Sequence, residues 1–327
     1  MTALPDATLR DLGEFGLVEA LTAIFPQGDR VLLGPGDDAA EVAFPDGRVL
    51  VSTDLHVETR HFRRDWASAL DIGHRVAAAN LSDISAMGGR ATALTVGLAA
   101  PPDLPVAWAL DLARGIGTAA RAAGTTILGG DLSSAPTGTL MLSVTALGSL
   151  EGRPPVLRSG ARPGDVVAVA GTLGLAAAGW LLLEAGRADA DPGAVALQRC
   201  PDPPLAQGPA AADAGATAML DLSDGLLRDA ARVARASSVR LDLRSAQLAG
   251  DVSRLEAALG SAAARECVLA GGEEHSLLAC FPPTTALPPG WRVVGAVHDG
   301  EGVTVDGRAE HARGWDHFGA GGSGPPG

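Results

Sequence analysis

Short acidic motifs recur along the chain at the ends of apolar runs, and they hold the residues best suited to chemistry. The first follows a glycine–proline–glycine turn and places Asp37 beside Asp38. Two adjacent ionised carboxylates repel each other, so an ordered loop that holds both needs a counter-charge, usually a divalent cation. Similar motifs follow at Ser52-Thr53-Asp54, Asn80-Leu81-Ser82-Asp83, Gly129-Gly130-Asp131 and Asp221-Leu222-Ser223-Asp224-Gly225. The pattern predicts that these motifs converge on one Mg²⁺ site that handles phosphate.

The number of aspartates indicates more than one metal ion. Mg²⁺ takes oxygen ligands and keeps several waters, so one or two carboxylates per ion suffice where phosphates supply the rest. The candidate carboxylates therefore suit two or more ions that bridge a polyphosphate: Asp38, Asp54, Asp83, Asp131, Asp221 and Asp224. Ser52 and Thr53 can add hydroxyl or backbone oxygens. Gly129-Gly130 lets backbone N–H groups approach a phosphate, and the planar guanidinium of Arg158 is a candidate phosphate clamp.

Each of these signals is weak when it is taken alone. An aspartate at a turn is usually only a turn residue, and Asp224 is equally well explained as the N-cap of a helix. His61 alone fits a solvated loop histidine, and Trp315 alone fits a residue that pins the C-terminus. The ordered set of motifs is what favours a common site.

The elements that must position these motifs alternate between strands and helices. Helices are predicted at 11–25, 68–87, 106–123, about 173–185, from 224 and about 251–263. Strands are predicted at 49–51, 91–98, 125–128, 140–147, 166–170, 219–222, 239–243, 276–281 and 292–297. This alternation predicts a two-domain α/β to α+β architecture with sites at strand ends. A Pro/Gly/Arg-rich connector places the boundary between domains 1–150 and 151–318, and the Gly/Ser/Pro tail 319–327 is predicted to be disordered.

Composition excludes several classes of protein. The 327 residues suit two domains, and a net charge of −13 argues against a nucleic-acid surface, although solubility alone also explains an acidic chain. All 25 Lys+Arg residues are Arg. The absence of lysine excludes the Walker A lysine, the protein-kinase strand lysine and lysine Schiff-base chemistry.

Cysteine usage and hydropathy predict a cytoplasmic protein. Cys200, Cys267 and Cys280 are far apart and form no CxxC pair, which argues against a disulfide framework or a zinc site and fits a reducing cytosol. The N-terminal stretch lacks the basic and apolar regions of a signal peptide. The apolar run 166–183 is interrupted by glycines, so it is interpreted as a buried strand, turn and helix rather than a membrane span.

The motifs together resemble the thiamine-monophosphate kinase family. The resemblance runs in order from about residue 13 to 318, through Gly36-Asp37-Asp38, Ser52-Thr53-Asp54, Asn80-Leu81-Ser82-Asp83 with Ala86-Met87-Gly88, Gly129-Gly130-Asp131, Arg158-Ser159-Gly160 with Pro163-Gly164-Asp165, Asp221-Leu222-Ser223-Asp224-Gly225, Gly271-Gly272-Glu273 and Gly314-Trp315-Asp316-His317-Phe318. It implies the fold shared with aminoimidazole-ribonucleotide synthetase and selenophosphate synthetase, with an N-terminal α/β domain that dimerises through its strands and a C-terminal α+β domain. It also implies ATP-dependent phosphorylation of thiamine monophosphate to thiamine diphosphate by a homodimer.

The resemblance also implies roles for particular residues. The Mg²⁺ ligands would be Asp38, Ser52, Thr53, Asp54, Asp83, Asp131, Asp221 and Asp224; the ATP contacts Gly130, Asp131, Arg158 and Ser223; and the substrate contacts His61, Glu274 and Trp315. Where the family usually has Glu-Asp-Tyr, this chain has Glu273-Glu274-His275. Glu274 keeps the charge on a side chain one methylene longer, and any contact made by the tyrosine is lost.

The expected reaction needs no covalent intermediate. The acceptor is a phosphate oxygen that is already ionised at neutral pH, so direct in-line transfer without a strong general base or a phosphoenzyme is predicted. Two alternatives stay open: another ATP-dependent synthetase of this superfamily, or a non-catalytic nucleotide- and Mg²⁺-binding module. The chain lacks a cysteine near the N-terminal glycine loop, as selenide chemistry would need, and a cysteine in its tail, as a hydrogenase-maturation protein of this fold would have.

Overall fold

The computed structural model describes residues 7–34, 40–311 and 313–314. The chain divides into two compact units. The first unit takes residues up to 84 together with 90–151, and the second takes residues 85–89 and those from 152 onward.

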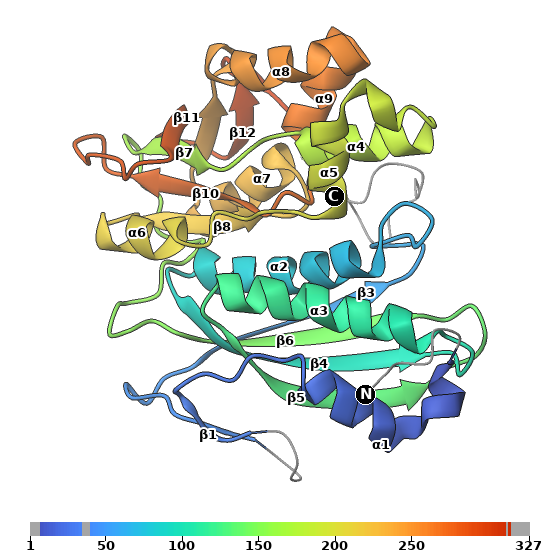
Figure 1. Cartoon of the computed structure of the whole chain (residues 1–327). Helices are drawn as coiled ribbons and strands as arrows, with labels where there is room; N and C mark the ends of the chain where they lie inside the picture. The colour runs from blue at the N-terminus through green and yellow to red at the C-terminus, as the bar shows by residue number, and fades with distance from the viewer. Residues whose placement is uncertain (1–6, 35–39, 312, 315–327) are drawn as a thin grey trace. The chain divides into compact units, whose positions relative to one another are not determined.

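The first unit is a four-stranded sheet with helices on one face. Its elements are α1 (Leu9–Thr22), β1 (Val31–Leu33), β2 (Glu41–Val42), β3 (Leu50–Val57), α2 (Ala69–Ala86, whose last two residues fall in the second unit), β4 (Arg90–Ala100), α3 (Val106–Ala122), β5 (Thr126–Ser134) and β6 (Met141–Ser149). The strand order is β3-β6-β4-β5, and only the β4–β5 pair is parallel. Helices α2 and α3 cover one face of this sheet (Figure 1). The β3 and β5 strands are therefore its two edges.

Helices α2 and α3 approach each other closely because glycines lie at their crossing. A Cβ on Gly73 of α2 would overlap the carbonyl oxygen of Leu112, and one on Gly115 of α3 would overlap that of Leu70. The small residues let the two backbones touch, which draws α2 down over the sheet. The fully buried Ile72, Val76 and Ala77 anchor the helix there.

Two strands of the first unit run further than the sequence predicted. His56 lies inside β3 rather than in a loop, and Gly129-Gly130-Asp131 lies inside β5 rather than after its end. The sequence predicts that this strand ends at residue 128, just before the two glycines. In the structure they keep pairing with β4, and a Cβ on Gly130 would overlap the backbone oxygen of Val96. Glycine at 130 is thus required by close strand packing.

The second unit is built on a seven-stranded mixed sheet. Its elements are β7 (Val166–Ala170), α4 (Leu175–Glu184), the 3₁₀ helix η1 (Ala188–Ala190), α5 (Pro192–Arg199), α6 (Gln207–Asp213), β8 (Ala218–Leu222), α7 (Leu226–Ser237), β9 (Arg240–Leu243), α8 (Ser245–Leu259), α9 (Ser261–Ala270), β10 (Ser276–Phe281), β11 (Trp291–His298), β12 (Gly302–Val305) and β13 (Arg308–Ala309). The strand order is β13-β12-β9-β11-β7-β10-β8, antiparallel except between β9 and β12.

Both faces of this sheet are covered. Val167 and Val169 of β7 belong to the larger core, which includes residues of α4, α7, α8 and α9. Ala168 and Ala170, which alternate with them, pack in a smaller core with Ala211 of α6. A strand buried on both faces is uniformly apolar, as Val166–Ala170 is.

The secondary structure of this unit differs from the prediction in three places. The stretch 186–209, for which the sequence predicts no helix or strand, holds η1, α5 and the start of α6. The helix predicted at 251–263 is two helices, α8 and α9, and the terminal hairpin β12–β13 is not predicted. Short apolar segments between prolines carry little periodic signal, which explains the first difference. The predicted fold class, two domains of mixed α/β content, is confirmed. Among the described residues, no helix is long and apolar enough to cross a membrane.

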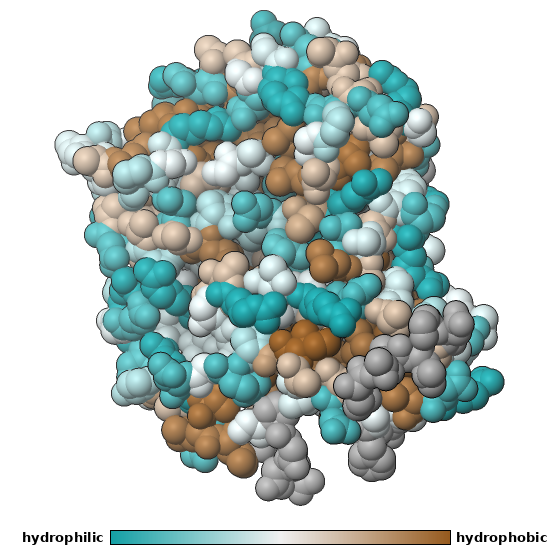
Figure 2. All heavy atoms as spheres, viewed as in Figure 1, coloured by the Kyte–Doolittle hydropathy of each residue, from teal (hydrophilic) through white to brown (hydrophobic). Residues whose placement is uncertain are grey.

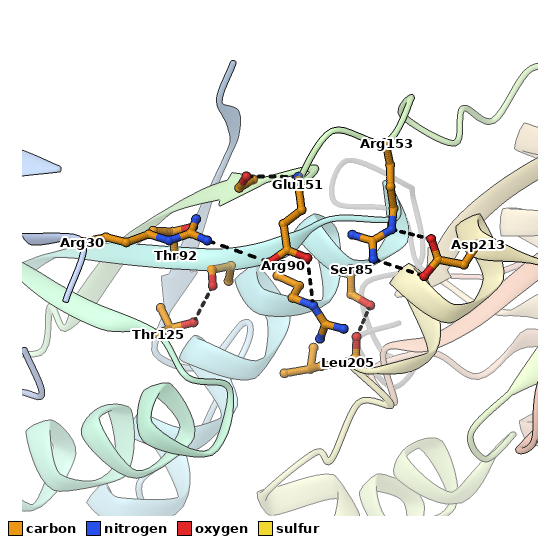
Figure 3. Close-up of polar contacts among 11 residues, drawn as sticks. Arg30, Ser85, Arg90, Thr92, Thr125, Glu151, Arg153, Leu205 and Asp213 are labelled. Atoms are coloured by element: carbon orange, nitrogen blue, oxygen red, sulfur yellow. Dashed lines mark hydrogen bonds and ion pairs between the residues drawn. The ribbon is translucent and has the colours of Figure 1, made fainter. Parts of the chain in front are cut away.

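Ion pairs hold the chain on either side of the boundary at 151/152 (Figure 3). In the first unit, Glu151 has a φ of 53°. Its Oε2 lies 3.3 Å from Arg90 Nε, and its Oε1 lies 3.9 Å from Arg30 Nη2. In the second, Arg153 makes a bidentate pair with Asp213 at the end of α6, at 2.6 and 3.1 Å. Bidentate geometry fixes direction as well as adding energy, so Arg153 is held firmly against the end of α6 within the second unit.

Candidate functional site

The candidate residues of the first unit begin with a contact between a strand and a helix. Ser52 of β3 donates its hydroxyl hydrogen to Asp83 Oδ2 of α2 at 2.5 Å. Asp54 lies two residues along the same strand, so it shares the face of Ser52. Both Asp54 and Asp83 are half-buried. The structure thus brings Ser52, Asp54 and Asp83 to one face of β3, as oxygen donors.

Thr53 has its side chain on the other face of the sheet. Its hydroxyl donates to the carbonyl oxygen of Val144 at 3.1 Å and lies 2.9 Å from the Thr145 hydroxyl. Successive strand residues point to opposite faces, so this separation from Ser52 and Asp54 is a direct consequence of strand geometry. If Thr53 is a metal ligand on the face of Asp54, the ligand atom would be its backbone oxygen.

Asp131 is separated from Asp54 within one copy of the chain. Asp54 pairs with Val144, Val144 with Val96, and Val96 with Gly130, so one row crosses all four strands. Three strand spacings amount to ~14 Å. Asp131, one residue beyond Gly130, points to the opposite face by strand alternation. One ion cannot touch both carboxylates of the same sheet.

Asn80 lies one turn before Asp83 on α2 and is fully buried. Its Nδ2 donates to the carbonyl oxygen of Val76 at 3.0 Å, and its Oδ1 accepts no hydrogen bond from any residue that the structure describes. A buried amide oxygen without a donor is costly. The helix therefore offers an unused oxygen on the turn that precedes Asp83.

His61 lies in a tight turn after β3. The backbone amide of Thr59 donates to the Phe62 carbonyl at 2.8 Å, and the Val57 amide donates to His61 Nδ1 at 3.0 Å. A ring nitrogen that accepts a backbone hydrogen bond is unprotonated, so the neutral ring carries its proton on Nε2. Thr59 has a φ of 69°, which is uncommon for a β-branched residue and marks the turn as constrained.

In the second unit, Asp221 is the next-to-last residue of β8, and Ser223 and Asp224 lie in the loop between β8 and α7. Asp221 is 5% exposed, and its Oδ2 lies 3.1 Å from Nδ1 of His275. His275 stands where the resembling family usually has tyrosine. The lost tyrosine contact is thus matched by a histidine that touches a candidate metal ligand. The carbonyl of Ser223 accepts from the Glu273 amide at 3.0 Å, which ties the two loops together.

Asp224 takes part in a network with Asp229 and Arg232 of α7. Arg232 donates Nη2 to Asp224 and Nη1 to Asp229, and Arg228 Nε lies 3.8 Å from the same Asp224 oxygen. Burial raises the pKa of Asp229 to about 7, and the charges of Asp221 and Asp224 add to this against the opposing effect of Arg232. The network thus packs two carboxylates against the guanidinium of Arg232, with the guanidinium of Arg228 nearby.

Arg158 is exposed and lies in a loop held by Ser237, the last residue of α7. The Ser237 hydroxyl accepts from the amides of Gly160 (3.1 Å) and Ala161 (3.2 Å) and donates to the Arg158 carbonyl (3.0 Å). The loop is fixed while the guanidinium stays accessible, as a phosphate contact requires.

Glu274 is almost fully buried, at 2% exposure. Its Oε1 accepts from the Ala176 amide at 3.1 Å, in the first turn of α4. Burial raises the pKa of this carboxyl to about 8, although the helix amides oppose the shift. In this conformation Glu274 faces the start of a helix, and a direct contact with substrate would require it to turn.

Some predicted residues fall outside the described part of the chain. They are Asp38 with the rest of its loop (35–39), Trp315, and the tail 319–327. Within the described ranges, no three His, Cys, Asp or Glu side chains are grouped closely enough to hold a metal ion by themselves.

Sequence reasoning missed Asp229 and Ser237. Asp229 carried a readable signal, because it falls on the inward face of α7 beside Leu226, Ala230 and Val233, all buried. A charged residue on the apolar face of an amphipathic helix needs a buried partner. Ser237 carried no comparable signal, since serine near a helix end is ordinary.

Comparison with known proteins adds the following. Residues 36–150 match the family model "AIR synthase related protein, N-terminal domain" and residues 162–308 the corresponding C-terminal domain. The chain is 47% identical over 324 residues to a thiamine-monophosphate kinase of Mycobacterium tuberculosis, covering 97% of this chain and 95% of the relative. The structure is similar to that of thiamine-monophosphate kinase from Stenotrophomonas maltophilia (TM-score 0.79, 32% identity, 91% and 98% of the two chains covered). It is also similar to AaThiL complexed with AMPPCP and TMP (TM-score 0.77, 30% identity, 95% and 99% covered).

Proposed function

The chain belongs to the thiamine-monophosphate kinase family, and we propose that it transfers the γ-phosphoryl group of ATP to thiamine monophosphate, giving thiamine diphosphate and ADP. The observation that carries this is the 47% identity that extends over 97% of the chain. A solved relative that binds an ATP analogue and TMP supports the same pair of substrates.

The candidate carboxylates suit Mg²⁺. Their donors are all oxygen, and Mg²⁺ needs only one or two carboxylates per ion when phosphates and waters complete its shell. Oδ1 of buried Asn80, which has no hydrogen-bond donor among the described residues, adds a further oxygen one turn before Asp83. We assign Mg²⁺ to Asp54, Asp83 and the Ser52 hydroxyl in the first unit, and to Asp221 and Asp224 in the second. When bound, the metal would offset the negative charge of the two phosphate groups and of the leaving ADP.

ATP would contact Gly130, Asp131, Arg158 and Ser223. An apolar cavity of about 150 Å³ borders Gly130 and Asp131, with Val18 and Ile116 among its walls. Such a cavity beside the backbone of an edge strand suits a flat heterocycle, because apolar walls exclude water while N–H and C=O groups fix its orientation. Arg158 would meet the phosphates, since Ser237 holds its loop while the side chain remains exposed.

His61 and Trp315 would contact thiamine monophosphate, and Glu274 would act without touching it. His61 Nε2 carries the proton of the neutral ring and can donate to a phosphate oxygen. Glu274 would act by holding the start of α4 rather than by touching substrate. The acceptor oxygen is already anionic at neutral pH, so no residue needs to take its proton, and we propose direct transfer without a phosphoenzyme.

A homodimer formed through the first unit's strands fits the surface of β3 and the separation of two candidate ligands. Val51 and Leu55 are 61% and 55% exposed on the outer face of this edge strand. Figure 2 shows a further apolar patch over β1, where Leu32 and Leu33 are exposed. A second copy would also supply Asp131 to a site that contains Asp54. We place the reaction in the cytoplasm, where a reducing environment suits the buried thiols of Cys267 and Cys280.

The proposal is tested by following ADP release with ATP and, in turn, thiamine monophosphate, thiamine and aminoimidazole precursors. ADP release that depends on thiamine monophosphate is expected. Release with an aminoimidazole precursor instead would identify another synthetase of the superfamily, and nucleotide binding without release would identify a binding module. Asp54→Asn and Asp131→Asn, each under saturating Mg²⁺, test the ligands, since near-normal turnover would remove that residue from the site.

A further inference from the structure

Asp229 anchors the backbone of the loop that carries Asp224. It is 0% exposed, and its Oδ2 accepts from the amides of Asp224 at 2.9 Å and Gly225 at 3.1 Å. An oxygen shared by two consecutive amides fixes both peptide planes, and hydrogen bonds to a carboxylate are stronger than those between neutral groups. The orientation of the Asp224 backbone is therefore set by a side chain five residues further along the chain.

Gly225 limits the alternatives open to this loop. Its φ of 114° is a conformation that side chains rarely adopt, and a Cβ at this position would lie 2.5 Å from the Ala270 carbonyl oxygen. The loop is thus pressed against the end of α9 on one side and held by Asp229 on the other. It has little freedom to rearrange when a ligand binds.

Arg232 links the anchor to the candidate ligand itself. The two terminal nitrogens of its guanidinium reach Asp229 Oδ1 and Asp224 Oδ2. The Asp224 and Asp229 side chains are 14% and 0% exposed, so their charges are only weakly screened by solvent. Because one cation is shared between two carboxylates, the charge left on Asp224 depends on Asp229.

We propose that Asp229 is a positioning residue that, through Arg232, sets how readily Asp224 takes up a divalent cation. This inference rests on the proposed role of Asp224. Without the negative charge of Asp229, Arg232 would pair with Asp224 alone and compete more strongly with the metal. Without Arg232, that competition would fall to what Arg228, 3.8 Å from Asp224 Oδ2, still exerts. The two substitutions should therefore shift metal binding in opposite directions, which a purely structural role would not do.

The test compares Asp229→Asn with Arg232→Met in the full-length protein. Mn²⁺ binding in the presence of ADP is titrated through the electron paramagnetic resonance signal of free Mn²⁺, and the Mg²⁺ dependence of ADP release is measured in parallel. Asp229→Asn is expected to raise the half-saturating cation concentration about 10-fold, and Arg232→Met to lower it about 3-fold, since tenfold in binding corresponds to a lost charged contact.

Asp191→Asn is the matched control. Asp191 is also buried (8% exposed), accepts a backbone amide from Ala194 at 3.1 Å, and pairs with Arg254, but it caps α5 away from the acidic loop. It should lower the melting temperature and leave the cation requirement unchanged. A cation shift in Asp191→Asn equal to that in Asp229→Asn would overturn the inference, as would shifts of the same sign in Asp229→Asn and Arg232→Met.

Asp224→Asn separates this inference from the proposed function. If Asp224→Asn leaves cation binding unchanged, Asp224 is no ligand and the positioning role fails, whereas the proposed function fails only if ADP release does not depend on thiamine monophosphate. If Asp224→Asn weakens binding and Asp229→Asn does not, only the positioning role fails. Should Asp229→Asn not fold, Arg232→Met decides, because tighter cation binding supports the role and unchanged or weaker binding refutes it.

Discussion

Apart from His61 in a turn and Asp221 on a strand, the two units fix their candidate residues by different means. In the first unit, Asp54, Asp83 and Asp131 lie on β3, α2 and β5, so regular hydrogen-bonded elements hold them. In the second, Asp224 and Arg158 lie on loops, and the side chains of Asp229 and Ser237 hold those loops. Glu274 similarly holds the start of α4, after a glycine turn.

This difference predicts where remote substitutions will do damage. A strand or helix positions a side chain through many backbone hydrogen bonds, so the loss of one side-chain contact costs little. A loop relies on a few contacts, and its geometry is lost with any one of them. Function in the second unit should therefore be sensitive to residues that touch no ligand, and function in the first unit should not.

The largest effect is expected from Gly225→Ala. The substitution puts a Cβ 2.5 Å from the Ala270 carbonyl oxygen at a φ of 114°. We expect a loss of ~2 kcal/mol or more in the free energy of unfolding and a ~100-fold loss in kcat/KM, since a displacement of about 1 Å is enough for that. Urea unfolding and steady-state kinetics measure both. Gly250→Ala in α8, which meets no atom within 4 Å, is the control and should be slightly stabilising. Wild-type kinetics in Gly225→Ala would contradict the importance of the loop geometry.

Glu274→Gln should remove a pH dependence of stability. The pKa of Glu274 is about 8 in the folded chain against an ordinary 4.5, so between these values only the folded chain binds the proton. The stabilisation of the folded chain by protonated Glu274 is complete below about pH 4.5 and is lost as the pH rises through 8. We expect the free energy of unfolding to fall by up to ~1 kcal/mol per pH unit in this window, and to fall less in Glu274→Gln. Urea unfolding at several pH values tests this, with the exposed Glu184→Gln of α4 as control. Parallel pH profiles in both variants and the wild type would refute it.

Ser237→Ala should weaken ATP binding. It removes three hydrogen bonds that hold the loop of Arg158. We expect the KM for ATP to rise ~10-fold, about 1.4 kcal/mol, with kcat nearly unchanged, because the guanidinium remains but is no longer held in place. Ser253→Ala, on the exposed face of α8, is the control. An unchanged KM would show that the loop does not need this anchor.

Ser52→Ala should have the smallest effect. Asp83 loses the Ser52 hydroxyl but stays on α2, whose backbone is unaffected. We expect the Mg²⁺ concentration for half-maximal rate to rise ~3-fold, within the range for one hydrogen bond. Thr145→Val, on the outer face of β6, should leave it unchanged. If Ser52→Ala proved more damaging than Ser237→Ala, the contrast between the units would be reversed.

Prediction from sequence was most successful where periodicity is long and uninterrupted. The helices at 69–86 and 106–122 and the strand at 276–281 were placed to within one residue at each end. It failed at Gly129-Gly130-Asp131, where the glycines that suggested a loop serve close strand packing. It also failed at 186–209, where short helices between prolines leave too few turns to show a period.

The candidate site, like the fold, can be predicted from the sequence only in part. Local motifs single out Asp54, Asp83, Asp221 and Asp224 as candidates, because acidic residues beside apolar runs stand out along the chain. The sequence could not show that Asp131 and Asp54 lie on opposite edges and faces of one sheet, since strand order is a long-range property. It also could not show that Glu274 faces a helix 98 residues away.

The sequence by itself determined which chemistry is available, because residue types and their order carry the family motifs and the oxygen donors for a metal. Only the tertiary structure decided which donors share a face and which side chains hold them still. Those relations come from contacts between residues far apart in the chain, such as Ser52 with Asp83 and Asp221 with His275. Local sequence does not encode such distances, because they exist only after the core has packed.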